Sequence, residues 1–109
     1  MHTIEIKNAE LLEAITLRAK ELGIVNGAIV SLIGAVDHFT VSTMPADNAS
    51  ADVLTEYRQP AEMHGSGEIT DGVVHIHATL GIEGDRGVCG HLHRAEVGTW
   101  FVRAYVLPN

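Results

Sequence analysis

The most regular alternation of apolar and polar positions lies in the segment VVHIHATL, which runs from Val73 to Leu80. Because successive side chains of a strand point to opposite faces, this segment predicts a strand with one apolar and one polar face. The apolar face holds Val74, Ile76, Ala78 and Leu80, and the polar face holds Val73, His75, His77 and Thr79. If the segment after the next glycine-rich stretch is also extended, one of its faces holds Cys89, His91 and His93. Two His-x-His pairs are therefore expected side by side.

A second pattern, with apolar residues three or four positions apart, predicts an amphipathic helix over Ala9 to Leu22. Asn8 is a suitable N-cap because its side-chain oxygen can accept a free backbone N–H. Gly23 is placed to end the helix. We expect the apolar stripe of this helix to lie on a sheet, through Leu11, Leu12, Ile15, Ala19 and Leu22.

The rest of the chain favours strands separated by turns. A buried strand is expected over Gly27 to Val36, continuing through Val41, with a bend or bulge at Gly34. A polar loop follows over residues 43–52, and Thr70-Asp71-Gly72 predicts a hairpin turn. Further strands are expected at His2 to Lys7, Val53 to Tyr57, Glu62 to Ile69 and Trp100 to Leu107. The predicted fold class is α+β, a mainly antiparallel sheet of six to eight strands with one amphipathic helix packed on it.

The glycines of the segment between the two histidine pairs resemble a phosphate-binding loop only loosely. They are Gly81, Gly84, Gly87 and Gly90. A phosphate loop opens a helix, whereas the order here is strand, loop, strand. We expect a tight turn with positive backbone dihedrals and with Asp85 and Arg86 at its tip.

Length and charge narrow the classes of function. A chain of 109 residues that is 46% hydrophobic predicts one folded domain, residues 1–109. The net charge of −7 argues against direct binding of DNA, because Lys and Arg contacts to phosphates supply most of that affinity. One cysteine excludes an intramolecular disulfide and fits a reducing compartment. With no secretory signal and no apolar run of ~20 residues, we expect a soluble cytoplasmic protein that does not bind membranes.

The two histidine pairs are the candidate metal ligands of the chain. Neutral imidazole is a common zinc ligand, and catalytic zinc sites often use three histidines and a water molecule. We predict a site for zinc or another divalent metal ion at His75, His77 and His91. The alternative is that these are polar residues on a solvated or interfacial face of the sheet.

Three neighbouring residues have roles that the spacing leaves open. His93 is a fourth ligand, a group that orients a ligand, or an exposed side chain. Cys89 is a ligand or a small buried residue. Glu62, which would share a strand face with His64, is an acid or base near the site or part of a solvated edge.

The segment GVVHIHATLGIEGDRGVCGHL resembles the signature of the PPC ("plants and prokaryotes conserved") domain family. The family hallmark is an H-x-H strand followed by a loop and a G-H-L segment, here His75-Ile76-His77 and Gly90-His91-Leu92. The resemblance extends upstream through SLIGAVDHFTV and PAEMHGSGEIT. It implies an α+β fold, assembly into homotrimers and the label of a predicted DNA-binding protein. The fold is also similar to that of acetolactate decarboxylase, a zinc enzyme with a three-histidine site.

The chain departs from its relatives in two places. The basic AT-hook segment of the plant members is absent. The last strand, where relatives often have an acidic residue, contains Val102-Arg103-Ala104-Tyr105.

Two hypotheses follow. The first is a homotrimeric interaction module with a metal site, associated with transcription through protein partners. The second is a small metal-dependent enzyme, decarboxylase- or lyase-like, acting on an oxo- or hydroxy-acid. A concave pocket with an acid or base beside the histidines would favour the enzyme.

Overall fold

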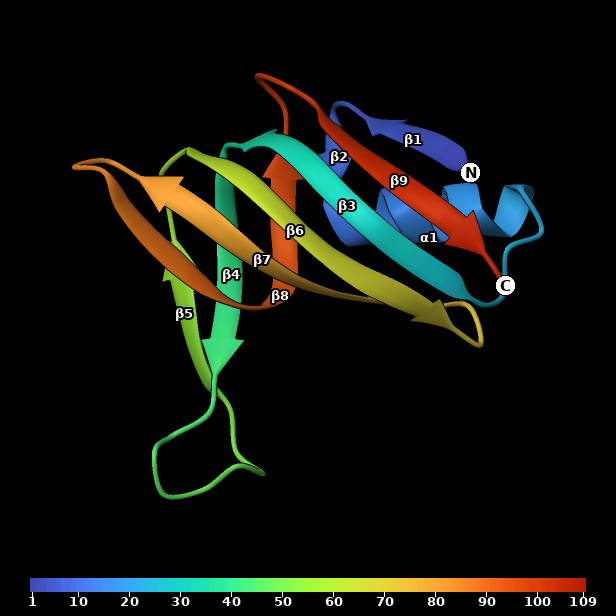
Figure 1. The fold of residues 1–109 in the computed structure, drawn as a ribbon. Helices are drawn as coiled ribbons and strands as arrows, with labels where there is room; N and C mark the ends of the chain where they lie inside the picture. The colour runs from blue at the N-terminus through green and yellow to red at the C-terminus, as the bar shows by residue number, and fades with distance from the viewer.

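The computed structural model describes residues 1–109 as nine β-strands and one α-helix, which confirms the predicted α+β class (Figure 1). Every strand pair is antiparallel, and the strands form one sheet in the order β1-β9-β3-β6-β7-β8-β4-β5, with the short β2 paired to β8. The elements are β1 (His2–Ile6), β2 (Ala9–Glu10), α1 (Leu11–Glu21), β3 (Gly27–Val36), β4 (His38–Thr43), β5 (Val53–Tyr57), β6 (Ala61–Thr70), β7 (Val73–Ile82), β8 (Arg86–Val97) and β9 (Val102–Pro108).

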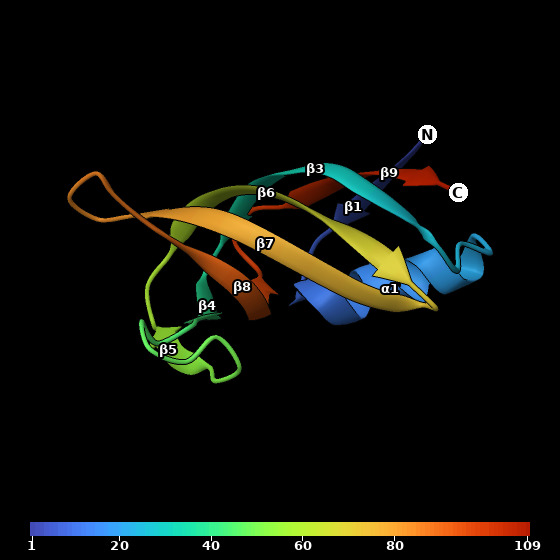
Figure 2. The same ribbon diagram turned by 60° about the horizontal axis from the view of Figure 1, so that its bottom comes forward.

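The helix lies against one face of the sheet, which we call the core face, and packs on β8, β1 and β7 (Figure 2). Its buried residues Leu11, Ile15 and Ala19 belong to one apolar core that receives side chains from the core faces of β1, β3, β4, β6, β7, β8 and β9. The opposite face of the sheet, which we call the outer face, has no helix over it. The one helix is not long and apolar enough to cross a lipid bilayer.

The helix begins two residues later than predicted, and Glu10 rather than Asn8 is its N-cap. Residues 9 and 10 are held in extended geometry as β2, so helical turns cannot start at Ala9. The Glu10 carboxylate accepts the backbone N–H groups of Leu12 and Glu13 at the helix start and of Ala95 in β8. This nearly buried side chain therefore ties the helix to the sheet.

The predicted helix end is confirmed. Gly23 has a φ of 72°, and its N–H donates to the Lys20 carbonyl, while the Ile24 N–H donates to the Ala19 carbonyl. Glycine adopts this left-handed conformation without steric cost, which makes it a common helix terminator.

The predicted continuous strand from Gly27 through Val41 is wrong, because the chain turns a corner at Asp37. β3 lies between β9 and β6, whereas β4 lies between β8 and β5. The Asp37 N–H donates to the Glu96 carbonyl (2.8 Å) and its carboxylate accepts the Thr99 N–H (3.1 Å). These long-range bonds hold the corner and were not visible in the local pattern.

The β3 bulge is displaced from the predicted position. The register shifts between Ile29 and Leu32, against both neighbouring strands, and not at Gly34. Gly34 instead allows close approach of the β9 side, because a Cβ there would overlap the Phe101 carbonyl.

Both predicted turns around β7 are present, but Arg86, predicted at the tip of the second turn, is instead the first residue of β8 and pairs with Ile82. Asp71 and Gly72, with φ of 50° and 79°, form a two-residue turn between β6 and β7. Gly84 and Asp85 have φ of 87° and 58° in the turn before β8, which begins at Arg86. The first turn matters most for the site, because a two-residue turn sets the register of the two strands that it joins.

Candidate metal centre

Three histidines from two adjacent strands meet on the outer face. His75 and His77 are exposed on β7, and His91 is half-buried on β8 directly opposite His77. One ring nitrogen from each residue lies within 4.8 Å of the other two. These are the three residues that the sequence predicted as ligands.

The spacing of these nitrogens fits one metal ion. The Nε2 atoms of His75 and His77 lie 3.2 Å apart. Two nitrogens bound to tetrahedral zinc at about 2.0–2.1 Å are separated by roughly 3.3 Å. The centroid of the His91 ring is 4.8 Å from that of His75 and 5.7 Å from that of His77, and its ligand nitrogen lies within 4.8 Å of the other two.

Electrostatics favour the form of His91 that binds metal. Burial lowers the pKa of His91 below its ordinary value of 6.5, and the neighbouring imidazoles of His93, His75 and His77 lower it further. Asp52 acts weakly in the opposite direction. A lowered pKa favours the neutral form of His91 at pH 7, which is the form that binds a metal ion.

His93 lies beside the three histidines but outside their cluster. The register of β8 with β4 shifts at this point, so that Thr40 pairs with Arg94 and Val41 with Leu92. The bulge turns His93 toward β4, where its Nε2 shares a 2.7 Å hydrogen bond with the Ser42 hydroxyl. Its ring centroid remains 4.6 Å from that of His91, so His93 is a neighbour of a predicted ligand.

Cys89 and Glu62 are not brought into the cluster. Cys89 is exposed on the outer face of β8, opposite Thr79. Glu62 pairs with Gly81 near the far end of β7 and lines a separate groove with Trp100. The geometry thus separates Glu62 from the histidines.

Two polar residues of β6 were missed by the sequence reasoning. Glu68 lies directly opposite His75, and Ser66 lies directly opposite His77. The sequence contained a signal for these two residues. A two-residue turn at Asp71-Gly72 pairs Thr70 with Val73, and each earlier residue of β6 then pairs with the correspondingly later residue of β7.

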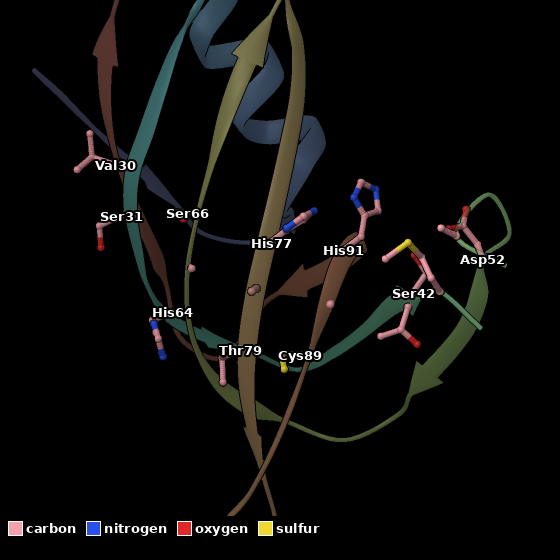
Figure 3. Close-up of a pocket in the computed structure, with 16 residues that line it drawn as sticks. Val30, Ser31, Ser42, Asp52, His64, Ser66, His77, Thr79, Cys89 and His91 are labelled. Atoms are coloured by element: carbon pink, nitrogen blue, oxygen red, sulfur yellow. The ribbon is translucent and has the colours of Figure 1, made fainter. Parts of the chain in front are cut away.

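A concavity of about 940 Å³ opens beside His77 and His91 (Figure 3). Asp52 reaches it from the loop between β4 and β5, and His64 reaches it from β6. The other polar side chains that line it are Ser31, Ser42, Thr43, Ser66, Thr79 and Cys89. No Lys or Arg lines this pocket, so only histidines and a metal ion could balance an anionic ligand.

Comparison with known proteins identifies relatives of the whole chain. The family model described as the Plants and Prokaryotes Conserved (PCC) domain matches residues 1–107. No curated protein matches. A metal-containing protein from Archaeoglobus fulgidus is 29% identical, with a TM-score of 0.77, and the alignment covers 98% of this chain and 77% of that one.

Two further solved structures share the fold at lower identity. A protein from Ralstonia eutropha JMP134, labelled as a DNA-binding candidate, is 21% identical with a TM-score of 0.83, over 98% of this chain and 76% of that one. A Staphylococcus aureus protein of unknown function, described as similar to α-acetolactate decarboxylase, is 20% identical with a TM-score of 0.66. That alignment covers 97% of this chain and 52% of the staphylococcal chain.

Proposed function

Because the chain belongs to the Plants and Prokaryotes Conserved domain family, we propose that it is a homotrimeric interaction module that holds a divalent metal ion. Its association with DNA then runs through protein partners. The observation that carries this proposal is the convergence of His75, His77 and His91 on one point of the outer face. The single free cysteine, exposed at position 89, fits the reducing cytoplasm, where we place the protein.

The metal is held by three neutral imidazoles, and zinc is the ion that suits this ligand set best. A metal ion in such a site supplies Lewis acidity and a rigid cross-link between strands. The metal-containing relative from Archaeoglobus fulgidus supports the proposal.

The metal proposal is tested by elemental analysis of protein purified without a histidine tag. We expect one divalent ion per chain, with zinc predominant. Absence of metal from both the purified protein and zinc-soaked crystals at the three histidines would overturn the proposal.

Charge argues that the isolated protein does not bind DNA. Fourteen acidic residues outnumber seven basic ones. Four of those seven form ion pairs with glutamates, namely Arg18, Arg58, Arg94 and Arg103. Since phosphate contacts by free Lys and Arg supply most of the affinity, little remains for a duplex. Fluorescence anisotropy at physiological salt should show no binding, whereas micromolar binding that weakens steeply with salt would contradict the module.

Assembly is supported by apolar side chains left uncovered on the outer side. Val30 and Ile33 in β3 are 51% and 55% exposed, and Leu107 in β9 is 47% exposed. Exposed apolar side chains on an open sheet face are candidates for burial in an interface. Light scattering should give a mass near three times 11.7 kDa, and a monomer that persists at high concentration would contradict the trimer.

The enzyme remains a second candidate because the 940 Å³ pocket opens onto two of the three histidines and contains Asp52 and His64. An oxo- or hydroxy-acid carries a carboxylate, however, and because no Lys or Arg lines the pocket, its charge would have to be balanced by the metal ion and the histidines alone. We therefore favour the module. Metal-dependent turnover of a small oxo- or hydroxy-acid that is lost in His64→Ala would reverse this preference.

A further inference from the structure

Each of the three histidines has an oxygen-bearing side chain directly opposite it on an adjacent strand. On β6, Ser66 pairs with His77 and Glu68 pairs with His75, while on β4 Ser42 pairs with His91. Residues directly opposite in an antiparallel pair share a face, with Cβ atoms roughly 4.5–5.5 Å apart. The cluster is therefore flanked on both sides by polar neighbours from β6 and β4.

Glu68 differs from the two serines in charge and reach. The Ser42 hydroxyl is already bonded to His93, and Ser66 has a short neutral side chain. The Glu68 side chain is exposed and takes part in none of the four ion pairs. Glu68 is therefore a carboxylate that lies next to a predicted ligand on the sheet and forms no ion pair.

The orientation of His75 determines which nitrogen Glu68 would meet. The Nε2 of His75 faces the Nε2 of His77, which leaves Nδ1 as the second ring nitrogen, on the side near the backbone. Glu68 lies on the adjacent strand, directly opposite His75. A ligand histidine generally donates the N–H of its second nitrogen to a carboxylate, a carbonyl or water, which sets its tautomer and ring orientation.

Two further features bring Glu68 and His75 together. A separate concavity of about 290 Å³ is lined by Glu68, Ser66, Gly67, His75 and His77, so the Glu68 carboxylate and the His75 ring border the same space. Gly67 also allows β6 to approach β7 closely, because a Cβ at that position would overlap the His75 carbonyl.

We propose that Glu68 is a positioning residue of the metal site, whose carboxylate accepts the Nδ1–H of His75 and holds Nε2 toward His77. The proposal rests on the metal site proposed above. Glu68 acts through His75, so it raises metal affinity without binding the ion itself.

The test compares zinc affinity, measured by competition with a chromophoric chelator, in the full-length protein and its variants. Glu68→Ala should weaken zinc binding about 10- to 100-fold, the usual effect of losing such a partner. Glu68→Gln should recover part of this loss, because its amide oxygen still accepts the N–H but lacks the charge that strengthens the bond. The chelator-treated variants should melt at the same temperature as the parent, since Glu68 is exposed.

Glu62→Ala is the matched control. Glu62 lies on the same strand and the same face as Glu68 and is also exposed, but it pairs with Gly81 instead of a histidine. The Glu62→Ala substitution removes an equal charge farther from the site, where solvent and salt screen that charge. Zinc affinity should therefore change less than about two-fold.

Cobalt(II) absorption separates a positioning residue from a ligand. In Glu68→Ala the cobalt bands should keep their positions, because the three histidines remain. A clear band shift would mean that Glu68 binds the ion directly and would overturn the proposal. Affinity in Glu68→Ala equal to that of the parent, or an equal loss in Glu62→Ala, would also overturn it. If the parent protein binds no zinc, the proposed metal site itself fails, and this is seen before any variant is made.

Discussion

Along β7, the side chains of Ile76, Ala78 and Leu80 lie on the core face and are at most 4% exposed, whereas His75 and His77 lie on the outer face and are exposed. On the core face every side chain is packed at high density, so a change of even one methylene group is felt. On the outer face a side chain can change with little effect on packing. One strand therefore serves stability and chemistry with separate residues, and each can be disturbed without the other.

The largest effect is expected on the core face. Ile76→Ala should lower the free energy of unfolding by about 2–5 kcal/mol, because Ile76 is fully buried and its loss leaves a cavity. Urea denaturation of chelator-treated protein measures this. Thr79→Ala, an exposed change on the same strand, should cost less than about 0.5 kcal/mol. If both variants lost the same free energy of unfolding, the two faces of β7 would not differ in their contribution to stability.

The next effect is confined to the outer face. With zinc at about 100 times its dissociation constant, the parent should gain about 2.7 kcal/mol of stability, since the ion binds only the folded chain. His77→Ala should lose this gain and yet unfold like the parent without metal. His64→Ala, which changes a pocket histidine outside the cluster, should keep the gain. A parent-like zinc shift in His77→Ala would place the metal elsewhere.

One substitution should disturb both faces. Gly67→Ala adds a methyl group against the His75 carbonyl, and such overpacking costs about 1–3 kcal/mol. Because β7 must shift at His75 to accommodate it, zinc affinity should fall as well. Gly87→Ala is the control, since its added Cβ would meet only the Thr79 Cγ2 at 3.7 Å, an ordinary contact. A loss of stability with unchanged zinc affinity would show that the histidines tolerate movement of β7.

The smallest effect concerns pH. The pKa of His91 is lowered in the folded protein by burial and by the nearby His93, His75 and His77, so the unfolded chain takes up a proton more readily than the folded one. Stability without metal should therefore fall as pH decreases below the ordinary value of 6.5, and be fully regained above it. Solvent screening of the half-buried ring keeps the change small. Denaturant unfolding of the parent and of His91→Ala at about pH 7.5 and 5.5 measures it, and an equal pH dependence in both would contradict this origin.

Local sequence patterns predicted the helix and the strands well, but they did not predict the features that depend on contacts between distant parts of the chain. The stripe from Leu11 to Ala19 and the terminator Gly23 located the helix because both signals act within a few residues. The N-cap was misplaced because pairing of β2 with β8, a long-range contact, holds Glu10 extended. The corner at Asp37 was missed for the same reason, since the groups that hold it lie in Glu96 and Thr99.

The sequence by itself determined that His75 and His77 share a face, because strand periodicity is local, and that Glu68 pairs with His75, because the Asp71-Gly72 turn sets the register. Only the tertiary structure decided that His77 stands opposite His91 and that the β8 bulge turns His93 to Ser42. The register set by the Asp71-Gly72 turn already places Glu62 opposite Gly81, away from the cluster. The position of His93 could not be predicted because a bulge shifts every later pair by one residue, and this bulge depends on how β8 pairs with β4, a strand some fifty residues earlier in the chain.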